Sequence, residues 1–162
     1  MKTSSKARYA LYLMTDIARH EHAGPVSLRE VSIRQSISSK YLEHIASNLS
    51  KFGYLLSVRG AQGGYKLAQD ATDISAGDIM RAAEGGFLPV ACLGEKAQSC
   101  PRQSRCCGVA GFWQGLRSTV DDYIDNVSLA ELATDVHAHT HANPRALRAD
   151  RPSKRVDLTD KC

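Results

Sequence analysis

Four cysteines lie close together in this chain and are the side chains best suited to chemistry. Their spacing is C-x7-C-x5-C with a further cysteine directly after, at Cys92, Cys100, Cys106 and Cys107. Thiolates are soft ligands that suit iron–sulfur clusters and zinc. The C-x2-C pair typical of structural zinc sites is missing, which counts against a structural zinc site. A zinc site, a redox-sensitive thiol cluster and cysteines with no ligand role stay open as alternatives.

The composition predicts where those thiols reside. Five cysteines in 162 residues are too few for a disulfide scaffold. The first residues contain no apolar stretch typical of a signal peptide, and no apolar run approaches the roughly 18 residues of a membrane span. We therefore expect a cytoplasmic protein with no membrane association, whose cysteines are reduced and free to bind metal or sense oxidation.

Charge is distributed unevenly along the chain, although the net charge is only +4. Residues 1–66 carry ten Lys or Arg against four Asp or Glu, whereas residues 67–135 carry five against ten. A basic first third joined to an acidic middle is typical of a module that binds a polyanion. A solvated surface of mixed charge is the alternative that charge alone leaves open.

The basic third contains the element order of a winged helix-turn-helix. Apolar periodicity predicts helices over residues 4–22, from Ser27 onward, and from Ser38 or Ser39 to about Phe52. Two β-prone runs, 54–58 and 65–68, then flank a glycine-rich tip and predict a hairpin. A further helix is predicted from Ser75 to Glu84.

The third predicted helix has a polar face suited to reading DNA. Lys40, Glu43 and His44 lie on that face, where a recognition helix presents side chains to base edges in the major groove. A glutamate there accepts a hydrogen bond from a cytosine amino group, and a lysine reaches guanine or phosphate. Tyr41 is expected either to contact a phosphate or to pack at the helix margin. Arg59, beside the glycine-rich tip, is suited to a narrow minor groove.

The second half of the chain is predicted to carry the cysteines and a dimer contact. Residues 85–107 form a cysteine-bearing loop, and residues 108–134, with another capped turn predicted at Ser128–Glu131, form a long dimerisation helix. Its apolar residues follow a 4-3-4-3-4 spacing, which is typical of a helix that packs against a long partner helix: Val109, Trp113, Leu116, Val120, Tyr123 and Val127. Packing onto its own domain is the alternative. Residues 135–162 are polar and are expected to be disordered.

The predicted fold is thus mainly α with a small β-hairpin: a winged helix-turn-helix domain in residues 1–84, a cysteine loop, and a long dimerisation helix. Over roughly residues 1–132 the chain resembles the IscR, NsrR and RirA family of bacterial winged-helix iron–sulfur transcription regulators. The resemblance rests on the three-cysteine loop before a Trp-bearing helix and on three motifs: SKARYA at 5–10, ISSKYLE at 37–43 and VRGAQGGY at 58–65.

This resemblance implies a homodimer that binds palindromic operators in double-stranded DNA and senses iron, cluster supply, redox state or nitric oxide. By position, Cys92, Cys100 and Cys106 match the cluster ligands. The family's DNA-contacting positions fall on both predicted DNA-binding elements: Ser38, Lys40, Tyr41, Glu43 and His44 in the third helix, and Arg59 in the wing.

One ligand position departs from the family pattern. Members with a 2Fe–2S cluster use a histidine shortly after the third cysteine, where this chain has Val109. Cys107 or a residue from the partner subunit's N-terminal helix is then the fourth ligand, and the cluster is 2Fe–2S or 4Fe–4S.

Taken together, the DNA-binding elements, the cysteines and the resemblance predict a transcriptional regulator that is not an enzyme. A thiol- or zinc-based regulator without iron and a small electron carrier are the alternatives.

Overall fold

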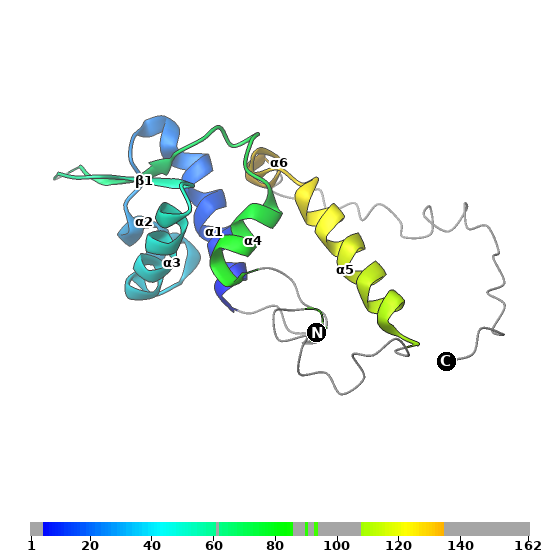
Figure 1. Ribbon diagram of the computed structural model, residues 1–162. Helices are drawn as coiled ribbons and strands as arrows, with labels where there is room; N and C mark the ends of the chain where they lie inside the picture. The colour runs from blue at the N-terminus through cyan, green and yellow to red at the C-terminus, as the bar shows by residue number, and fades with distance from the viewer. Residues whose placement is uncertain (1–4, 61, 86–89, 91–92, 94–107, 135–162) are drawn as a thin grey trace.

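The structure is a computed structural model that describes residues 5–60, 62–85, 90, 93 and 108–134. Helices dominate these residues, and a two-stranded antiparallel hairpin follows the third helix (Figure 1). The elements in chain order are α1 (Ser5–His20), a 3-10 turn η1 (Glu21–Ala23), α2 (Leu28–Gln35), α3 (Ser39–Lys51), β1 (Leu55–Val58), β2 (Gly64–Leu67), α4 (Ala76–Glu84), α5 (Ala110–Asp125) and α6 (Leu129–Thr134). The mainly helical fold with one predicted wing is confirmed.

Helix α1 lies at the centre of the body and packs against α3, α4 and α6. Its apolar stripe, which includes Leu13, Met14 and Ile17, is fully buried. Apolar side chains from the other elements complete the same core, among them Val31, Leu42, Leu49, Ile79 and Leu129. One continuous core therefore holds the helix-turn-helix, α4 and α6 together.

Side-chain caps fix the ends of the helices. Ser27 and Glu30 form a capping box at the start of α2, and Ser75 and Asp78 form one at the start of α4, as their spacing predicts. Helix α2 ends at Gln35, and its C-cap Ser36 has a left-handed backbone with a φ of 54°. The turn is short, because Ser38, the N-cap of α3, follows two residues after Ser36.

The wing is tied to the body through the segment before α2. Strands β1 and β2 pair from Leu55 opposite Leu67 to Val58 opposite Gly64. Val26 and Tyr65 exchange backbone hydrogen bonds of 2.9 and 2.8 Å. A Cβ on Gly64 would collide with the carbonyl of Val26, so this close pairing requires glycine.

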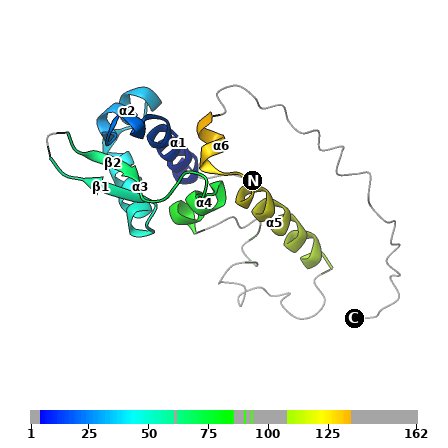
Figure 2. The same cartoon turned by 90° about the horizontal axis from the view of Figure 1, so that it is seen from above.

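Residues 108–134 form two helices instead of one long dimerisation helix, and the second begins at the predicted capped turn, Ser128–Glu131. They form α5 and α6, because Ser128 and Glu131 cap a new helix: each accepts the other's backbone N–H. Helix α6 returns to the body, where Leu129 is buried and Arg19 Nε donates to the carbonyl of Ala133 at 2.7 Å. Helix α5 instead extends away from the body on the side opposite the wing (Figures 1 and 2).

In the part of the chain that the structure describes, no helix is long and apolar enough to cross a membrane. The predicted tail, 135–162, and most of the predicted cysteine loop lie outside the described residues.

Candidate nucleic-acid interface

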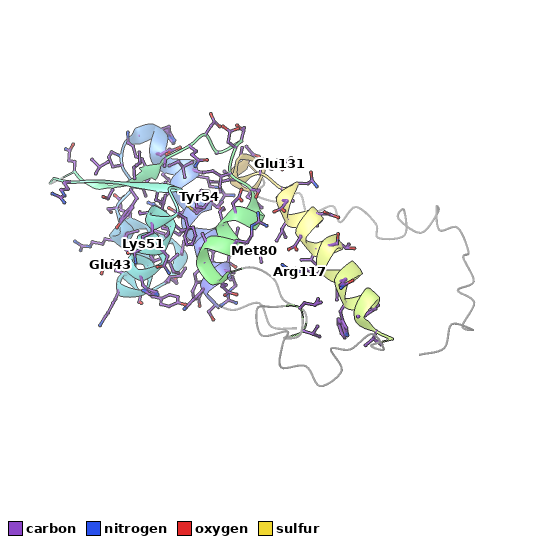
Figure 3. The ribbon with its side chains drawn as sticks, in the orientation of Figure 1. Glu43, Lys51, Tyr54, Met80, Arg117 and Glu131 are labelled. Carbon is purple, nitrogen blue, oxygen red and sulfur yellow. The ribbon has the colours of Figure 1, made fainter. Side chains whose placement is uncertain are left out.

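Helix α3 separates a buried apolar face from an exposed polar one. Leu42, Ile45, Ala46 and Leu49 are buried. Lys40, Glu43 and His44 are exposed, and Figure 3 shows Glu43 on the outer side of the body, away from α5. The predicted reading face is therefore free to meet another molecule.

The start of α3 is fixed by Ser38. The Ser38 hydroxyl accepts a hydrogen bond from the backbone N–H of Tyr41 at 3.3 Å, and Ser38 is exposed. This N-cap satisfies one of the free N–H groups of the first turn. The positive end of the α3 dipole also lies here, so the exposed first turn is suited to a phosphate.

Tyr41 is half-buried and packs at the margin of α3. Its ring meets the ring of Tyr9 edge to face, with 5.7 Å between the centroids. Tyr9 in turn lies 6.4 Å from Tyr12 and carries the Arg8 guanidinium over its ring at 4.9 Å. The aromatic residues of α1 thus buttress the first turn of α3, a role that the spacing within α1 alone does not indicate.

A buried carboxylate holds the end of α2 in place. Asp16 in α1 is 2% exposed and accepts hydrogen bonds from Arg34 Nη2 at 2.6 Å, Arg34 Nε at 3.1 Å and Gln35 Nε2 at 2.9 Å. Burial opposes ionisation, but the bonds from Arg34 and Gln35 outweigh it and lower the pKa of the Asp16 carboxyl. Since Arg34 and Gln35 directly precede the turn to α3, Asp16 orients the helix-turn-helix. Sequence reasoning missed this residue.

Arg59 follows β1 and is exposed beside Gly60. Gly60 has a φ of 119°, a backbone conformation that residues with a Cβ rarely adopt. A Cβ on Gly63 would collide with the carbonyl of Val58. The glycines therefore serve the tight wing tip, and the arginine lies at its base.

The four clustered cysteines, Cys92, Cys100, Cys106 and Cys107, lie outside the described residues. Among the described residues, no group of three or more His, Cys, Asp or Glu could hold a metal ion. One hydrogen bond does reach this part of the chain: Arg117 Nη1 on α5 donates to the carbonyl of Leu93 at 3.1 Å. Figure 3 shows Arg117 partway along α5.

Comparison with known proteins agrees with this geometry. The family model for Rrf2, an iron-dependent transcriptional regulator, matches residues 3–135. The chain belongs to the Rrf2 family. It is 40% identical over 135 residues to the transcriptional regulator IscR of Vibrio parahaemolyticus, covering 83% of this chain and 79% of that one. It is 36% identical over 157 residues to IscR of Escherichia coli O1:K1, covering 93% and 95%.

Solved Rrf2-type structures share the fold. CymR, the global cysteine regulator of B. subtilis, has a TM-score of 0.72 and 32% identity, over 85% of this chain and 99% of that one. IscR of T. potens has a TM-score of 0.66 and 32% identity, over 91% and 96%. This Rrf2-family chain is thus an IscR-like, DNA-binding transcriptional regulator and not an enzyme.

Proposed function

We propose that this Rrf2-family protein is a homodimeric regulator that binds palindromic operators through α3 and the wing and responds to a cysteine-ligated iron–sulfur cluster. The observation that carries the DNA-binding part is the exposed polar face of α3, backed by four buried apolar residues and a capped first turn. The same arrangement places a recognition helix in the major groove in other helix-turn-helix proteins.

Each exposed side chain has a distinct task at the operator. Glu43 selects a base by accepting from a cytosine amino group and repelling bases that offer only acceptors. Lys40 and His44 flank it on the same exposed face and reach guanine or phosphate. Ser38 lies at the phosphate-binding end of α3, and Arg59 enters the minor groove from the wing. Tyr41 contributes by packing against Tyr9 and so holding the first turn.

The partner for α5 is a second copy of this chain. Within α5 only Ile124 is buried, whereas Phe112 and Tyr123 are 65% and 71% exposed. The half-buried Trp113, Leu116 and Val120 lie along the same apolar seam. A symmetric pair of these helices would cover the seam and present two reading helices to the two halves of a palindrome.

Cys92, Cys100 and Cys106 are the proposed cluster ligands, with Cys107 as a candidate fourth. As a donor set, three or four thiolates fit an iron–sulfur cluster. A bound cluster would make the protein responsive to iron supply and redox conditions, because its assembly and its oxidation state depend on them. The hydrogen bond from Arg117 to Leu93 ties the residue after Cys92 to α5, so a change in the cysteine segment reaches the dimer helix.

Two substitutions test the DNA-binding proposal. Glu43→Ala should relax base preference at one position in each half-site, because the side chain reads a base edge. Arg59→Ala should weaken binding to many sequences and reduce the log–log salt slope by about 1 for each phosphate that is no longer neutralised. Binding curves on an operator selected from random DNA and on its single-base variants, at several salt concentrations, measure both. Unchanged base preference in the first variant with unchanged affinity and salt slope in the second would refute the proposal.

Anaerobic purification followed by absorbance and iron and sulfide analysis tests the cluster. An iron–sulfur centre gives visible charge-transfer bands, whereas zinc does not. The similarity to CymR, whose structure from Staphylococcus aureus is known in an oxidised form, makes a thiol-based response the alternative function. Colourless protein that contains neither iron nor sulfide, yet loses operator binding on oxidation, would favour that alternative.

A further inference from the structure

Helix α5 is attached to the body at its C-terminal end. Three backbone hydrogen bonds join the chain after α5 to the segment around the start of α4: Ala76 N–H to the carbonyl of Val127 at 2.8 Å, Leu129 N–H to that of Ile74 at 2.7 Å, and Ala130 N–H to that of Ala71 at 3.0 Å. Ile124, in the last turn of α5, is buried. These hydrogen bonds fix where α5 leaves the body, and they lie beyond its last turn.

An ion pair joins α4 to the last turn of α5. Arg81 Nη2 on α4 lies 2.7 Å from Asp125 Oδ1 on the last turn of α5 and 3.0 Å from Asp78 Oδ1 on α4 itself. Burial opposes ionisation of Asp78, but hydrogen bonds from Ser75 and Arg81 outweigh it and lower the pKa of that carboxyl. Asp78 therefore stays charged and orients the guanidinium toward Asp125.

Gly77 provides the space in which this ion pair forms. A Cβ at this position would collide with Asp125 Oδ1 and would lie 2.9 and 3.0 Å from the two terminal nitrogens of Arg81. Gly77 is buried in the first turn of α4, and its φ is not positive. Its backbone conformation therefore does not require glycine, and glycine within a helix is less favourable than alanine. The atoms that a Cβ would meet are the ends of the Asp125 and Arg81 side chains, so an alanine here would displace these side chains and separate the ion pair while leaving the backbone in place.

A small change in the tilt of α5, where Asp125 and Arg81 join it to α4, produces a large displacement of its far end. A helix of 16 residues is about 24 Å long at 1.5 Å per residue. A tilt of about 10° at the joint thus moves the far end by roughly 4 Å, close to the 3.4 Å rise of one DNA base pair. Because α5 is the proposed dimer helix, such a tilt changes the distance between the two recognition helices.

We propose that Gly77, Arg81 and Asp125 are positioning residues that set the half-site spacing preferred by the dimer. The inference rests on the proposed function, namely on dimerisation through α5 and binding to paired half-sites. It assigns a role in operator selection to residues outside the proposed recognition helix and wing.

Operators that differ only in spacing test this inference. Paired half-sites selected with the wild-type protein are lengthened or shortened by one base pair at a time, and a single half-site serves as a second probe. The wild-type protein should prefer one spacing by about tenfold, which is comparable to the effect of one mismatched base pair. Gly77→Ala and Asp125→Asn should shift the preferred spacing or reduce the preference to below about threefold, with single half-site affinity unchanged.

Asp121→Asn is the matched control, because it breaks an ion pair of similar exposure that stays within α5, between Arg117 and Asp121. It should keep the wild-type spacing. The double variant Gly77→Ala/Asp125→Ala should behave like Gly77→Ala alone, since both substitutions remove the same interaction, the ion pair between Arg81 and Asp125.

The outcomes separate this inference from the proposed function. A wild-type spacing preference retained in Gly77→Ala and Asp125→Asn, no spacing preference in the wild-type protein, or an equal change in Asp121→Asn would each overturn the inference alone. Failure of the wild-type protein to bind paired half-sites, or a monomer in sedimentation, would contradict the proposed function itself.

Discussion

Removing either partner of the Asp16–Arg34 ion pair should destabilise the protein, and the two removals should differ. Asp16 is 2% exposed, whereas the Arg34 side chain is 33% exposed. Asp16→Asn leaves an arginine that water still reaches, so we expect a loss of about 2 kcal/mol in the free energy of unfolding. Arg34→Met leaves a buried carboxylate without its cation, and we expect a loss of about 3 kcal/mol or more.

The pH dependence of the two variants gives a second, independent test. In the wild-type protein the pKa of Asp16 lies below its ordinary 3.8, so its contribution is present above that pH and is lost as the pH falls through the lower folded value. In Arg34→Met, burial dominates and the pKa of Asp16 should rise. Protonation then favours the folded state, and the deficit relative to wild type should shrink as the pH falls from 7 toward 4.

Urea unfolding at one fixed protein concentration measures these differences, since the stability of a dimer depends on concentration. Asp121→Asn, which breaks an exposed ion pair, should change stability by less than about 1 kcal/mol and serves as the control. The double variant Asp16→Leu/Arg34→Leu should cost less than Arg34→Met alone. A destabilisation in Arg34→Met no larger than that in Asp121→Asn at pH 7, or a deficit that grows as the pH falls, would refute this role of Asp16.

Three further predictions concern other parts of the chain. Glu84→Ala should lower stability by about 0.5–1 kcal/mol in thermal unfolding, because Glu84 Oε1 accepts from the N–H of Ala7 at 3.1 Å in the first turn of α1; Glu84→Gln, which keeps the acceptor, should cost less. Leu116→Asp with Val120→Asp should give a monomer in sedimentation, since unpaired charges would enter the apolar seam; an unchanged dimer mass would place the interface elsewhere. Single Cys92→Ala, Cys100→Ala and Cys106→Ala variants should lose most iron and visible absorbance, and full retention in all three would exclude them as ligands.

Elements whose signals are local in sequence were predictable. The capping boxes at Ser27 and Ser75 mark the starts of α2 and α4 because each cap involves residues three apart. The exposed face of α3 follows from helical spacing alone, and the wing from its glycines. The capped turn at Ser128 was predictable for the same reason, whereas its consequence, a separate helix α6 that packs on the body, was not, because it depends on contacts with the distant helix α1.

Interactions between distant residues could not be predicted in the same way. Asp16 and Arg34 are 18 positions apart, and a charged residue on an otherwise apolar helix face gives no sign of its partner. Tyr9 and Tyr41 meet only because α1 and α3 cross. Gly77 and Asp125 belong to helices separated by the whole cysteine segment, so neither residue by itself indicates that a side chain on one helix fills the space left by glycine on the other.

These distant interactions join the two ends of the proposed regulator. Glu84 closes α4 directly before the cysteine segment and binds the first turn of α1, whose Tyr9 supports the first turn of α3. Arg117 attaches Leu93 to α5, and Asp125 at the other end of α5 pairs with Arg81 on α4. Allosteric regulation requires an element that has two arrangements. The sensing site and the DNA must each shift the equilibrium between these arrangements. Helix α5 is the candidate for that element: it is joined to the body at its C-terminal end, Ile124 is its one buried residue, and Arg117 partway along it donates to the carbonyl of Leu93.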